Sequence, residues 1–472
     1  MLNRRSPLLT LLFASVTLTA TIPASADERP NILFILADDL SWSDLGCYGN
    51  PWFETPNLDK LATQGARFTQ AYSAAPICSA SRASILTGKT PAQLGFEFVT
   101  KPEPGFQTVN APLRTPRFTL NLPLEETTIA EALNETGYET AFFGKWHLNQ
   151  HYQRYLGWSP THGPKAQGFQ TAEEDFGSHP YSYWNQKEKR SFLDLKEGEF
   201  VEDGLTEHAI GFLKQDHKKP FFLMVSHFYV HDPIHTRVKW LHDHYLDMIP
   251  ADHPRREILA HYGAMVTSLD HYVGQLLDAL NEAGLADSTY VTFTSDNGGH
   301  PNYAGNAPLR GSKWNLYEGG IRVPMLVRWP HKIEGGSVSD EPVSGVELFA
   351  TFQSLAETGQ RPDLSGGDHY WHFPYYHPEK KFKAAPVEIG INDGVTSQTR
   401  PHSAIRRGNW KLVQFYENRN VELYDLAADP YEHSDLSESN PTKTSELRDA
   451  LNNHLEKAGA RLPTKNPDYK KP

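Results

Sequence analysis

The sequence is poor in cysteine, in net positive charge and in long apolar runs. Only two of its 472 residues are cysteine, Cys47 and Cys78, which excludes a fold stapled by several disulfides. The formal net charge is −12, whereas a nucleic-acid-binding protein usually carries a positive balance. After residue 26, no stretch approaches the roughly 20 apolar residues of a membrane-spanning helix. We therefore expect no nucleic-acid partner and no membrane anchor, and an anionic substrate would have to be captured by local basic residues.

The length indicates more than one structural unit. A chain of 472 residues is too long for one ordinary core, so one large and one smaller domain are expected. The composition is that of a globular protein, with 39% hydrophobic and 22% charged residues. The composition changes near residue 365, where a stretch rich in aromatic residues and histidine follows. We therefore place the large domain at 27–365 and a C-terminal subdomain at 366–472.

The first 26 residues have the layout of an export signal. Two arginines at 4 and 5 form a basic start, an apolar run follows at 8–18, and small residues at 24–26 (ASA) form a cleavage site. The apolar run is too short to span a bilayer comfortably. We expect cleavage after Ala26 and export to a bacterial periplasm or secretion. Loss of the two arginines takes the net charge from −12 to −14.

Two predicted strands are followed directly by oxygen-bearing side chains. Residues 31–37 (NILFILA) form a continuous apolar run, typical of a strand buried in a parallel sheet, and Asp38 and Asp39 follow it. A later strand predicted at 289–294 is followed by residues 296–297 (DN). Ligands of open α/β sheets bind outside the carboxyl ends of the strands, so these side chains can surround a cation. A polar turn after a buried strand has the same pattern.

Two further predicted strands are followed by basic side chains. The strand at 138–143 precedes Lys145 and His147, and the strand at 221–227 precedes His231. Lys145 and His147 can address one ligand only if the chain turns between them. Taken alone, Lys145 and His147 are interpreted as surface residues.

Cys78 stands at the start of a short predicted helix, with its body at 82–86 and its end at Gly88. Ser79 or Ser81 is the expected N-cap. Unpaired N–H groups and the positive end of the dipole favour an anionic centre, or a nucleophile that attacks an anion, at a helix N-terminus. A lone cysteine at such a position is more often a small buried hydrophobic residue than a nucleophile. Other segments of the chain therefore decide which of these roles Cys78 has.

Five segments together resemble the type I sulfatases, the formylglycine-dependent family of the alkaline phosphatase-like superfamily. Residues 78–88 (CSASRASILTG) match the pattern Cys-x-(Pro/Ala)-x-Arg followed by Leu-Thr-Gly, and residues 137–147 (GYETAFFGKWH) resemble the second signature of the family. The resemblance runs from about residue 30 to 436 and is greatest to exported bacterial carbohydrate sulfatases. The three other segments are 230–234 (VHDPI), 296–300 (DNGGH) and 308–324 (PLRGSKWNLYEGGIRVP).

The resemblance implies a fold and a metal. The fold is α/β, with a large N-terminal domain built on a mixed, mostly parallel sheet between helices and a smaller C-terminal α+β subdomain with an antiparallel sheet. Asp38, Asp39, Asp296 and Asn297 would hold a cation together with the modified Cys78. Hard oxygen ligands suit Ca²⁺, with Mg²⁺ as the alternative.

The resemblance also implies a covalent modification of Cys78. In the family this cysteine is oxidised after translation to formylglycine (3-oxoalanine), which requires a separate maturation enzyme, and the aldehyde hydrate is the nucleophile. Cys47 would then remain as a lone buried thiol. If Cys78 stays unmodified, the two cysteines of an exported protein can instead form one disulfide.

Besides Cys78, five residues match the catalytic positions of the family. Lys145, Lys313 and His231 would grip the sulfate oxygens, and His231 or Lys313 would protonate the departing oxygen. Arg82 and His147 would hydrogen-bond the hydrate, and His147 would remove the proton of its second hydroxyl so that sulfate is released. The implied activity is hydrolysis of sulfate esters on a carbohydrate, such as a polysaccharide or glycosaminoglycan fragment.

Substrate specificity is expected in the loops at 89–125, 149–204 and 369–402. The part at 369–377 is rich in aromatic residues and histidine. It can stack on sugar rings, and it can equally seal a domain interface.

Single residues within these regions are weaker candidates. His300 and His402 are candidate substrate contacts, and Arg310 matches the family pattern with no role beyond shaping the site. Asp232 stands where the family has threonine, which changes the local polarity but leaves the neighbouring His231 in place.

Two other functions compete with the sulfatase. A phosphate or phosphonate ester hydrolase of the same superfamily would share the sheet and the metal carboxylates, but the full ligand set of a second metal is not evident. A sulfoglycan-binding protein with an inactive site is the other alternative, although every expected catalytic residue is present. The sequence indicates neither the sugar nor an oligomeric state.

Overall fold

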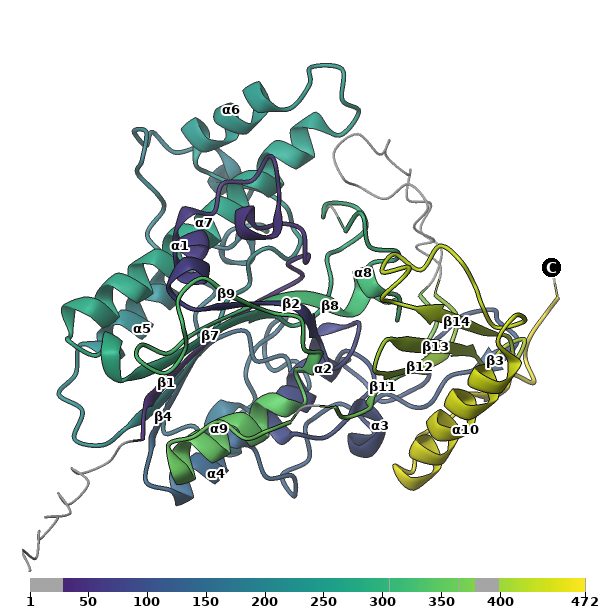
Figure 1. The fold of residues 1–472 in the computed structure, drawn as a ribbon. Coiled ribbons are helices and arrows are strands. Elements are labelled where there is room, and N and C mark those ends of the chain that lie inside the picture. Colours follow the sequence, from purple (N-terminus) through teal and green to yellow (C-terminus); the bar gives the residue numbers. More distant parts are fainter. Residues whose placement is uncertain (1–28, 305, 365, 378–398, 472) are drawn as a thin grey trace, which may run out of the picture.

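A computed structural model describes residues 29–304, 306–364, 366–377 and 399–471. The expected export signal and its cleavage site lie outside these residues. A sheet of nine strands forms the centre of the larger part (Figure 1), in the order β10-β2-β8-β7-β1-β6-β4-β5, with β9 paired to β2. Its strands are β1 Asn31–Ala37, β2 Ala66–Tyr72, β4 Glu139–Gly144, β5 Thr171–Glu173, β6 Phe221–Ser226, β7 Thr289–Ser295, β8 Arg322–Arg328, β9 Ser337–Ser339 and β10 Val343–Ser344.

The sheet is mixed but mostly parallel. β1 runs parallel to β6 and β7, and β4 runs parallel to β5 and β6, whereas β8 is antiparallel to β2 and β7. In β1 the side chains at 32–37 are fully buried. This explains the unbroken apolar run, because a central parallel strand is covered on both faces.

Helices cover both faces of the sheet, and the alternating side chains of β1 divide between them. Leu33 and Ile35 pack with α1, α5, α6 and α7, whereas Ile32 and Phe34 pack with α2, α4 and α9. Within the described residues, no helix is both long and apolar enough to cross a membrane. The helices are α1 Pro56–Gln64, α2 Cys78–Thr87, α3 Pro91–Leu94, α4 Ile129–Glu135, α5 Gly204–Leu213, α6 Lys239–Met248, α7 Arg256–Glu282, α8 Glu318–Ile321, α9 Glu347–Thr358 and α10 Pro441–Lys457.

The smaller part is an antiparallel sheet with α10 against it, which confirms the predicted fold class. Its order is β11-β12-β13-β14, and a separate ribbon pairs β3 with β15. The strands are β3 Leu113–Arg114, β11 His369–Phe373, β12 His402–Arg407, β13 Trp410–Phe415, β14 Val421–Asp425 and β15 Thr464–Lys465. Five short 3₁₀ turns also occur in the described residues, η1 Gly46–Tyr48, η2 Pro164–Gln167, η3 Pro180–Ser182, η4 Lys187–Arg190 and η5 Ala286–Ser288.

The predicted start of α2 is wrong. The helix begins at Cys78 itself, its N-cap is Ile77, and no side chain caps it. Ser79 and Ser81 are therefore inside the helix, and the Ser79 hydroxyl donates to the carbonyl of His147 at 2.7 Å. Ser79 thus links α2 to the loop that follows β4 instead of capping the start of the helix. The predicted end is confirmed, because Gly88 has φ of 66°.

The aromatic stretch at 369–377 seals the junction between the two sheets. Trp371, Phe373 and Tyr375 are buried in one cluster with Tyr72 of β2. The indole of Trp371 donates to the carbonyl of Ser73 at 2.8 Å. Of the two roles left open for this stretch, the described part has the interface role.

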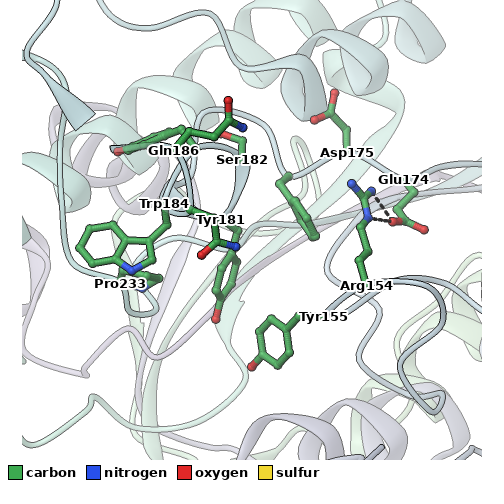
Figure 2. A pocket seen from close by; sticks show the side chains of 12 residues that line it. Arg154, Tyr155, Glu174, Asp175, Tyr181, Ser182, Trp184, Gln186 and Pro233 are labelled. Atoms are coloured by element: carbon green, nitrogen blue, oxygen red, sulfur yellow. Dashed lines mark hydrogen bonds and ion pairs between the residues drawn. The ribbon is translucent and has the colours of Figure 1, made fainter. Parts of the chain in front are cut away.

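The insertion at 149–204 contains only β5 and three 3₁₀ turns as regular structure. Its side chains line a pocket on the surface (Figure 2). The run at 187–190, which is η4, has no buried residue.

A buried ion triad joins the small sheet to the large part. The ammonium group of Lys411 lies 2.8 Å from carboxylate oxygens of both Glu318 and Glu432, and all three side chains are buried. Glu432 also accepts from the backbone N–H of Glu318 at 2.7 Å. Burial raises the pKa of Glu432 to about 7, so this carboxyl depends on the lysine for its charge.

Replacement of this lysine should destabilise the protein strongly. Lys411→Met removes the cation that two buried carboxyl groups share, although Arg322 remains 3.5 Å from Glu318. Removing one partner of a buried ion pair typically costs about 3–5 kcal/mol of unfolding free energy. Lys443→Met is the matched control, because Lys443 pairs with Glu446 on an exposed face of α10 and should cost no more than about 0.5 kcal/mol. Urea unfolding followed by tryptophan fluorescence measures both. Equal losses would contradict the assignment of the triad as a structural link.

Candidate active site

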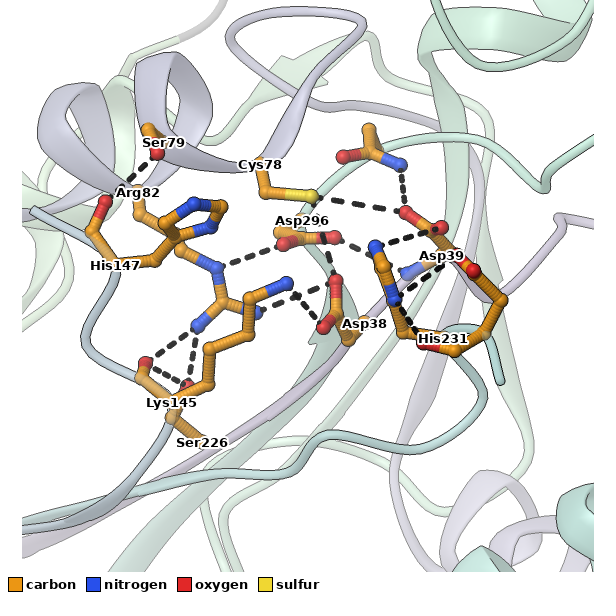
Figure 3. A network of polar contacts seen from close by, with 12 residues as sticks. Asp38, Asp39, Cys78, Ser79, Arg82, Lys145, His147, Ser226, His231 and Asp296 are labelled. Carbon is orange, nitrogen blue, oxygen red and sulfur yellow. Dashed lines mark hydrogen bonds and ion pairs between the residues drawn. The ribbon is translucent and has the colours of Figure 1, made fainter. Parts of the chain in front are cut away.

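Side chains from four parallel strands meet at one edge of the large sheet (Figure 3). The strands end at the same level, because Ala37 pairs with Ser295 and Gly144 pairs with Ser226. Residues that follow these strands must therefore share the carboxyl edge, as the sequence predicts. They are Asp38 and Asp39 after β1, Lys145 and His147 after β4, His231 after β6, and Asp296 and Asn297 after β7.

Cys78 lies at the centre of this group. Its sulfur is 3.5 Å from Oδ1 of Asp38, 3.8 Å from Oδ1 of Asp39 and 3.3 Å from Nζ of Lys313. The side chain is 1% exposed. The structure thus brings the start of α2, the end of β1 and the distant Lys313 loop together at one sulfur atom.

Three cations neutralise the three buried carboxylates. Nζ of Lys313 lies 2.6 and 2.7 Å from the two oxygens of Asp39, and Lys145 pairs with Asp38.

The third cation is the guanidinium of Arg82. Its Nε lies 2.7 Å from Asp296, and it also donates to the carbonyl of Lys145 and to the Ser226 hydroxyl at 2.7 and 2.5 Å. Arg82 therefore ties the start of α2 to the ends of β4, β6 and β7.

The pKa values report the same balance of burial and charge. Burial alone would raise the pKa of Asp38, but Lys145, His231 and Arg82 outweigh it and hold that pKa well below its ordinary value. Burial dominates at Asp296 and raises its pKa to about 6. Burial also raises the pKa of the Cys78 thiol well above its ordinary value.

The chain turns at His147, which is the condition for Lys145 and His147 to face one site. His147 has φ of 58° and Asp39 has φ of 61°, a left-handed conformation that costs a residue other than glycine about 1–3 kcal/mol. Both positions lie at the site. Burial lowers the pKa of His147 well below its ordinary value, and its Nδ1 has no hydrogen-bond partner among the described residues.

His231 connects the carboxylates to the insertion. Its Nε2 is 3.7 Å from Oδ2 of Asp39, and its Nδ1 is 2.9 Å from the hydroxyl of Tyr181. Tyr181 and Ser226 were not predicted as site residues. Neither follows a recognisable pattern, since Tyr181 lies in an insertion without periodicity.

The donor set fits a divalent cation. Ligand atoms of Asp38, Asp39, Cys78 and His231 all lie within 4.8 Å of one another. The amide oxygen of Asn297 is buried and has no partner among the described residues, while its Nδ2 donates to Asp39 at 2.7 Å. An unpaired buried carbonyl oxygen beside carboxylates is the kind of donor that Ca²⁺ and Mg²⁺ take.

The three weaker candidates have different surroundings. The ring of His300 lies 5.0 Å from that of Trp314, the neighbour of Lys313, and burial lowers its pKa to about 3. Arg310 donates to the hydroxyl of Tyr424 at 2.7 Å, and Nε2 of His402 accepts from the N–H of Leu316 at 2.9 Å. Arg310 and His402 thus have bonding partners at the junction of the two sheets.

The two cysteines are not joined. Cys47 and Cys78 are both free thiols, which excludes the disulfide alternative in this structure. Cys47 is half-buried, and burial together with the nearby Asp59 raises the pKa of its thiol to about 12.

Two models of known protein families match the chain. The model of the sulfatase family matches residues 30–358, and the model of the C-terminal region of N-sulphoglucosamine sulphohydrolase matches residues 312–461. The chain belongs to the sulfatase family.

Individual relatives are similar over much of the chain. N-acetylgalactosamine-6-sulfatase of Rattus norvegicus is 33% identical over 73% of this chain and 66% of its own length. The chain thus spans slightly less than two thirds of that relative. A sulfatase of Formosa agariphila is 28% identical over 94% of this chain and 91% of its own. The solved structure of Ps i-CgsB in complex with k-i-k-neocarrahexaose has a TM-score of 0.69 and 27% identity, covering 90% of this chain and 93% of that chain.

Calcium should stabilise the folded protein through this site. A ligand that binds only the folded state, at about 100 times its Kd, adds about 2.7 kcal/mol of stability. Thermal unfolding with and without Ca²⁺ should show this gain in the unmutated protein, and Asp38→Asn should lose it. Asp216→Asn, at an exposed surface pair with Lys218, should keep it. A calcium response that survives Asp38→Asn would place the ion elsewhere.

Proposed function

We propose that the protein hydrolyses sulfate esters of carbohydrates, with residue 78 as the nucleophile after conversion to formylglycine. The observation that carries the proposal is the meeting of Cys78 with two carboxylates and Lys313 at distances of 3.3–3.8 Å. Membership of the sulfatase family supports it. The names of the relatives, among them an N-acetylgalactosamine-6-sulfatase and a structure in complex with a neocarrahexaose, support a sulfated saccharide as the substrate class.

Oxygen atoms of Asp38, Asp39, Asp296 and Asn297, with residue 78, would hold Ca²⁺, or Mg²⁺ as the alternative. When bound, such a cation lowers the pKa of a hydroxyl beside it and offsets the negative charge of a sulfate group. With Asp39 engaged in holding the cation, Lys313 would no longer be needed to neutralise it, and its ammonium group would face the substrate.

The basic side chains would bind the sulfate group and move protons. Lys145, Lys313 and His231 lie around Cys78 and would hold the sulfate oxygens, a contribution that grows as charge shifts towards them in the transition state. His231 or Lys313 would protonate the departing alcohol oxygen. His147 would take the proton whose removal releases sulfate, because its buried neutral ring keeps Nδ1 without a partner among the described residues.

The location and the maturation of the protein belong to the same proposal. We expect removal of the first 26 residues, export to a periplasm or secretion, and encounter with a formylglycine-generating enzyme of the host. An exported protein meets polysaccharide and glycosaminoglycan fragments directly. The division at residue 365 into a catalytic domain and a C-terminal subdomain remains our proposal for the domain boundary.

A matched pair of esters tests the reaction. The sulfate and the phosphate esters of 4-methylumbelliferone share one leaving group, so their relative kcat/KM reports which anion the site favours. We expect the sulfate ester to be hydrolysed faster. A panel of defined sulfated sugars then identifies the saccharide, and faster hydrolysis of the phosphate ester would favour the phosphatase alternative.

Cys78→Ser should abolish turnover, because a sulfated serine has no second hydroxyl whose deprotonation expels the sulfate. Cys47→Ser is the matched control and should keep the activity of the unmutated protein. Mass spectrometry of the intact tryptic peptide should show residue 78 lighter than cysteine by the thiol-to-aldehyde difference, after coexpression with a maturation enzyme. Full turnover by the serine variant would reject this mechanism.

A further inference from the structure

A pocket of about 600 Å³ opens beside the proposed catalytic group. Figure 2 shows that its walls come mainly from the insertion at 149–204, with Pro233 from the segment that carries His231. The side chains that matter for its chemistry are Arg154, Tyr155, Glu174, Asp175, Tyr181 and Trp184.

One wall residue of the pocket, Tyr181, also contacts the catalytic group. The hydroxyl of Tyr181 lies 2.9 Å from Nδ1 of His231, whose Nε2 faces Asp39 at 3.7 Å. Tyr181 therefore belongs to both the pocket wall and the shell around the sulfate position. A ligand in the pocket would therefore lie next to His231, one of the side chains proposed to hold the sulfate group.

Aromatic rings form much of the pocket surface. Tyr155 is 52% exposed, and its ring meets that of Tyr181 edge to face at 5.6 Å. Arg190, which is not a lining residue, fixes the indole of Trp184. Its guanidinium lies 4.0 Å over the ring and donates a hydrogen bond to the Trp184 carbonyl. Fixed, partly exposed rings provide flat apolar faces for the C–H side of a sugar ring.

The charges of the lining disfavour a second sulfate. The charged side chains among the lining residues are one cation, Arg154, and two carboxylates, Glu174 and Asp175. Arg154 already forms an ion pair within the lining, because its Nε lies 2.6 Å from a carboxylate oxygen of Glu174. An anion placed here would find no unpaired cation in the lining, whereas carboxylates readily accept hydrogen bonds from hydroxyl groups.

We propose that this pocket binds an uncharged sugar residue linked to the sulfated residue, so that the protein acts on an oligosaccharide rather than on a sulfated monosaccharide alone. This inference rests on the proposed function. It adds a binding site and a constraint on the substrate: the sugar linked to the sulfated sugar carries no sulfate or carboxylate group.

The test compares matched substrates in matched variants. The probes are the sulfated monosaccharide that is hydrolysed fastest in the panel, the disaccharide that links it to a neutral sugar, and the same disaccharide with a second sulfate on the neighbour. We expect kcat/KM for the neutral-neighbour disaccharide to exceed that of the monosaccharide by about five- to tenfold, the range of one aromatic contact. The doubly sulfated disaccharide should lose this gain.

Trp184→Ala should reduce the disaccharide-to-monosaccharide ratio to near one, and Trp184→Phe should keep part of it. Tyr431→Ala, at an exposed tyrosine outside the lining, should keep the unmutated ratio. Hydrolysis of 4-methylumbelliferyl sulfate shows whether each variant retains its catalytic centre. An unchanged ratio in Trp184→Ala, or a preference for the doubly sulfated disaccharide, would overturn the inference.

Calorimetry separates this inference from the proposed function. In a Cys78→Ala background, which cannot turn over, the neutral-neighbour disaccharide should bind about five- to tenfold more tightly than the monosaccharide, and Trp184→Ala should remove the difference. Equal affinities would overturn the pocket assignment even if sulfate esters are hydrolysed. Absence of hydrolysis with an intact affinity difference would overturn the proposed reaction alone.

Discussion

The structure depends on the burial of three carboxylates, Asp38, Asp39 and Asp296, at one edge of a sheet. Charges removed from water are costly unless opposite charge compensates them closely. Arg82, Lys145 and Lys313 provide that compensation here, and all three are themselves buried. A hydrophobic core of the same volume would fold at least as well, so the arrangement is better explained by what it can bind.

The surrounding architecture serves to hold this group in place. β1 is central and covered on both faces, so Asp38 and Asp39 leave the most constrained strand of the sheet. The Lys313 segment reaches the same point from a loop that is anchored at the small sheet, because Glu318 lies five residues further on and binds Lys411. The ion triad and the catalytic group are thus connected through one short stretch of chain.

Sequence patterns predicted the strands well and the loops poorly. The runs at 31–37 and 289–294 are recognisable because burial dictates their residues, and they appear as β1 at 31–37 and as β7 at 289–295. The N-cap prediction at Ser79 or Ser81 failed because the helix starts at the cysteine itself. The walls of the pocket were not predictable beyond their region, since the insertion has no repeat from which a side chain's direction follows.

We expect oxygen atoms that follow β1 and β7 to hold one cation beside residue 78 at the start of α2. A crystal structure of the protein grown with Ca²⁺ measures this most directly. The account predicts an ion about 2.3–2.6 Å from oxygens of Asp38, Asp39, Asp296 and Asn297, with Lys313 moved off Asp39. A structure at saturating Ca²⁺ in which the Lys313 ammonium still bridges both oxygens of Asp39 and no ion lies among these side chains would contradict it.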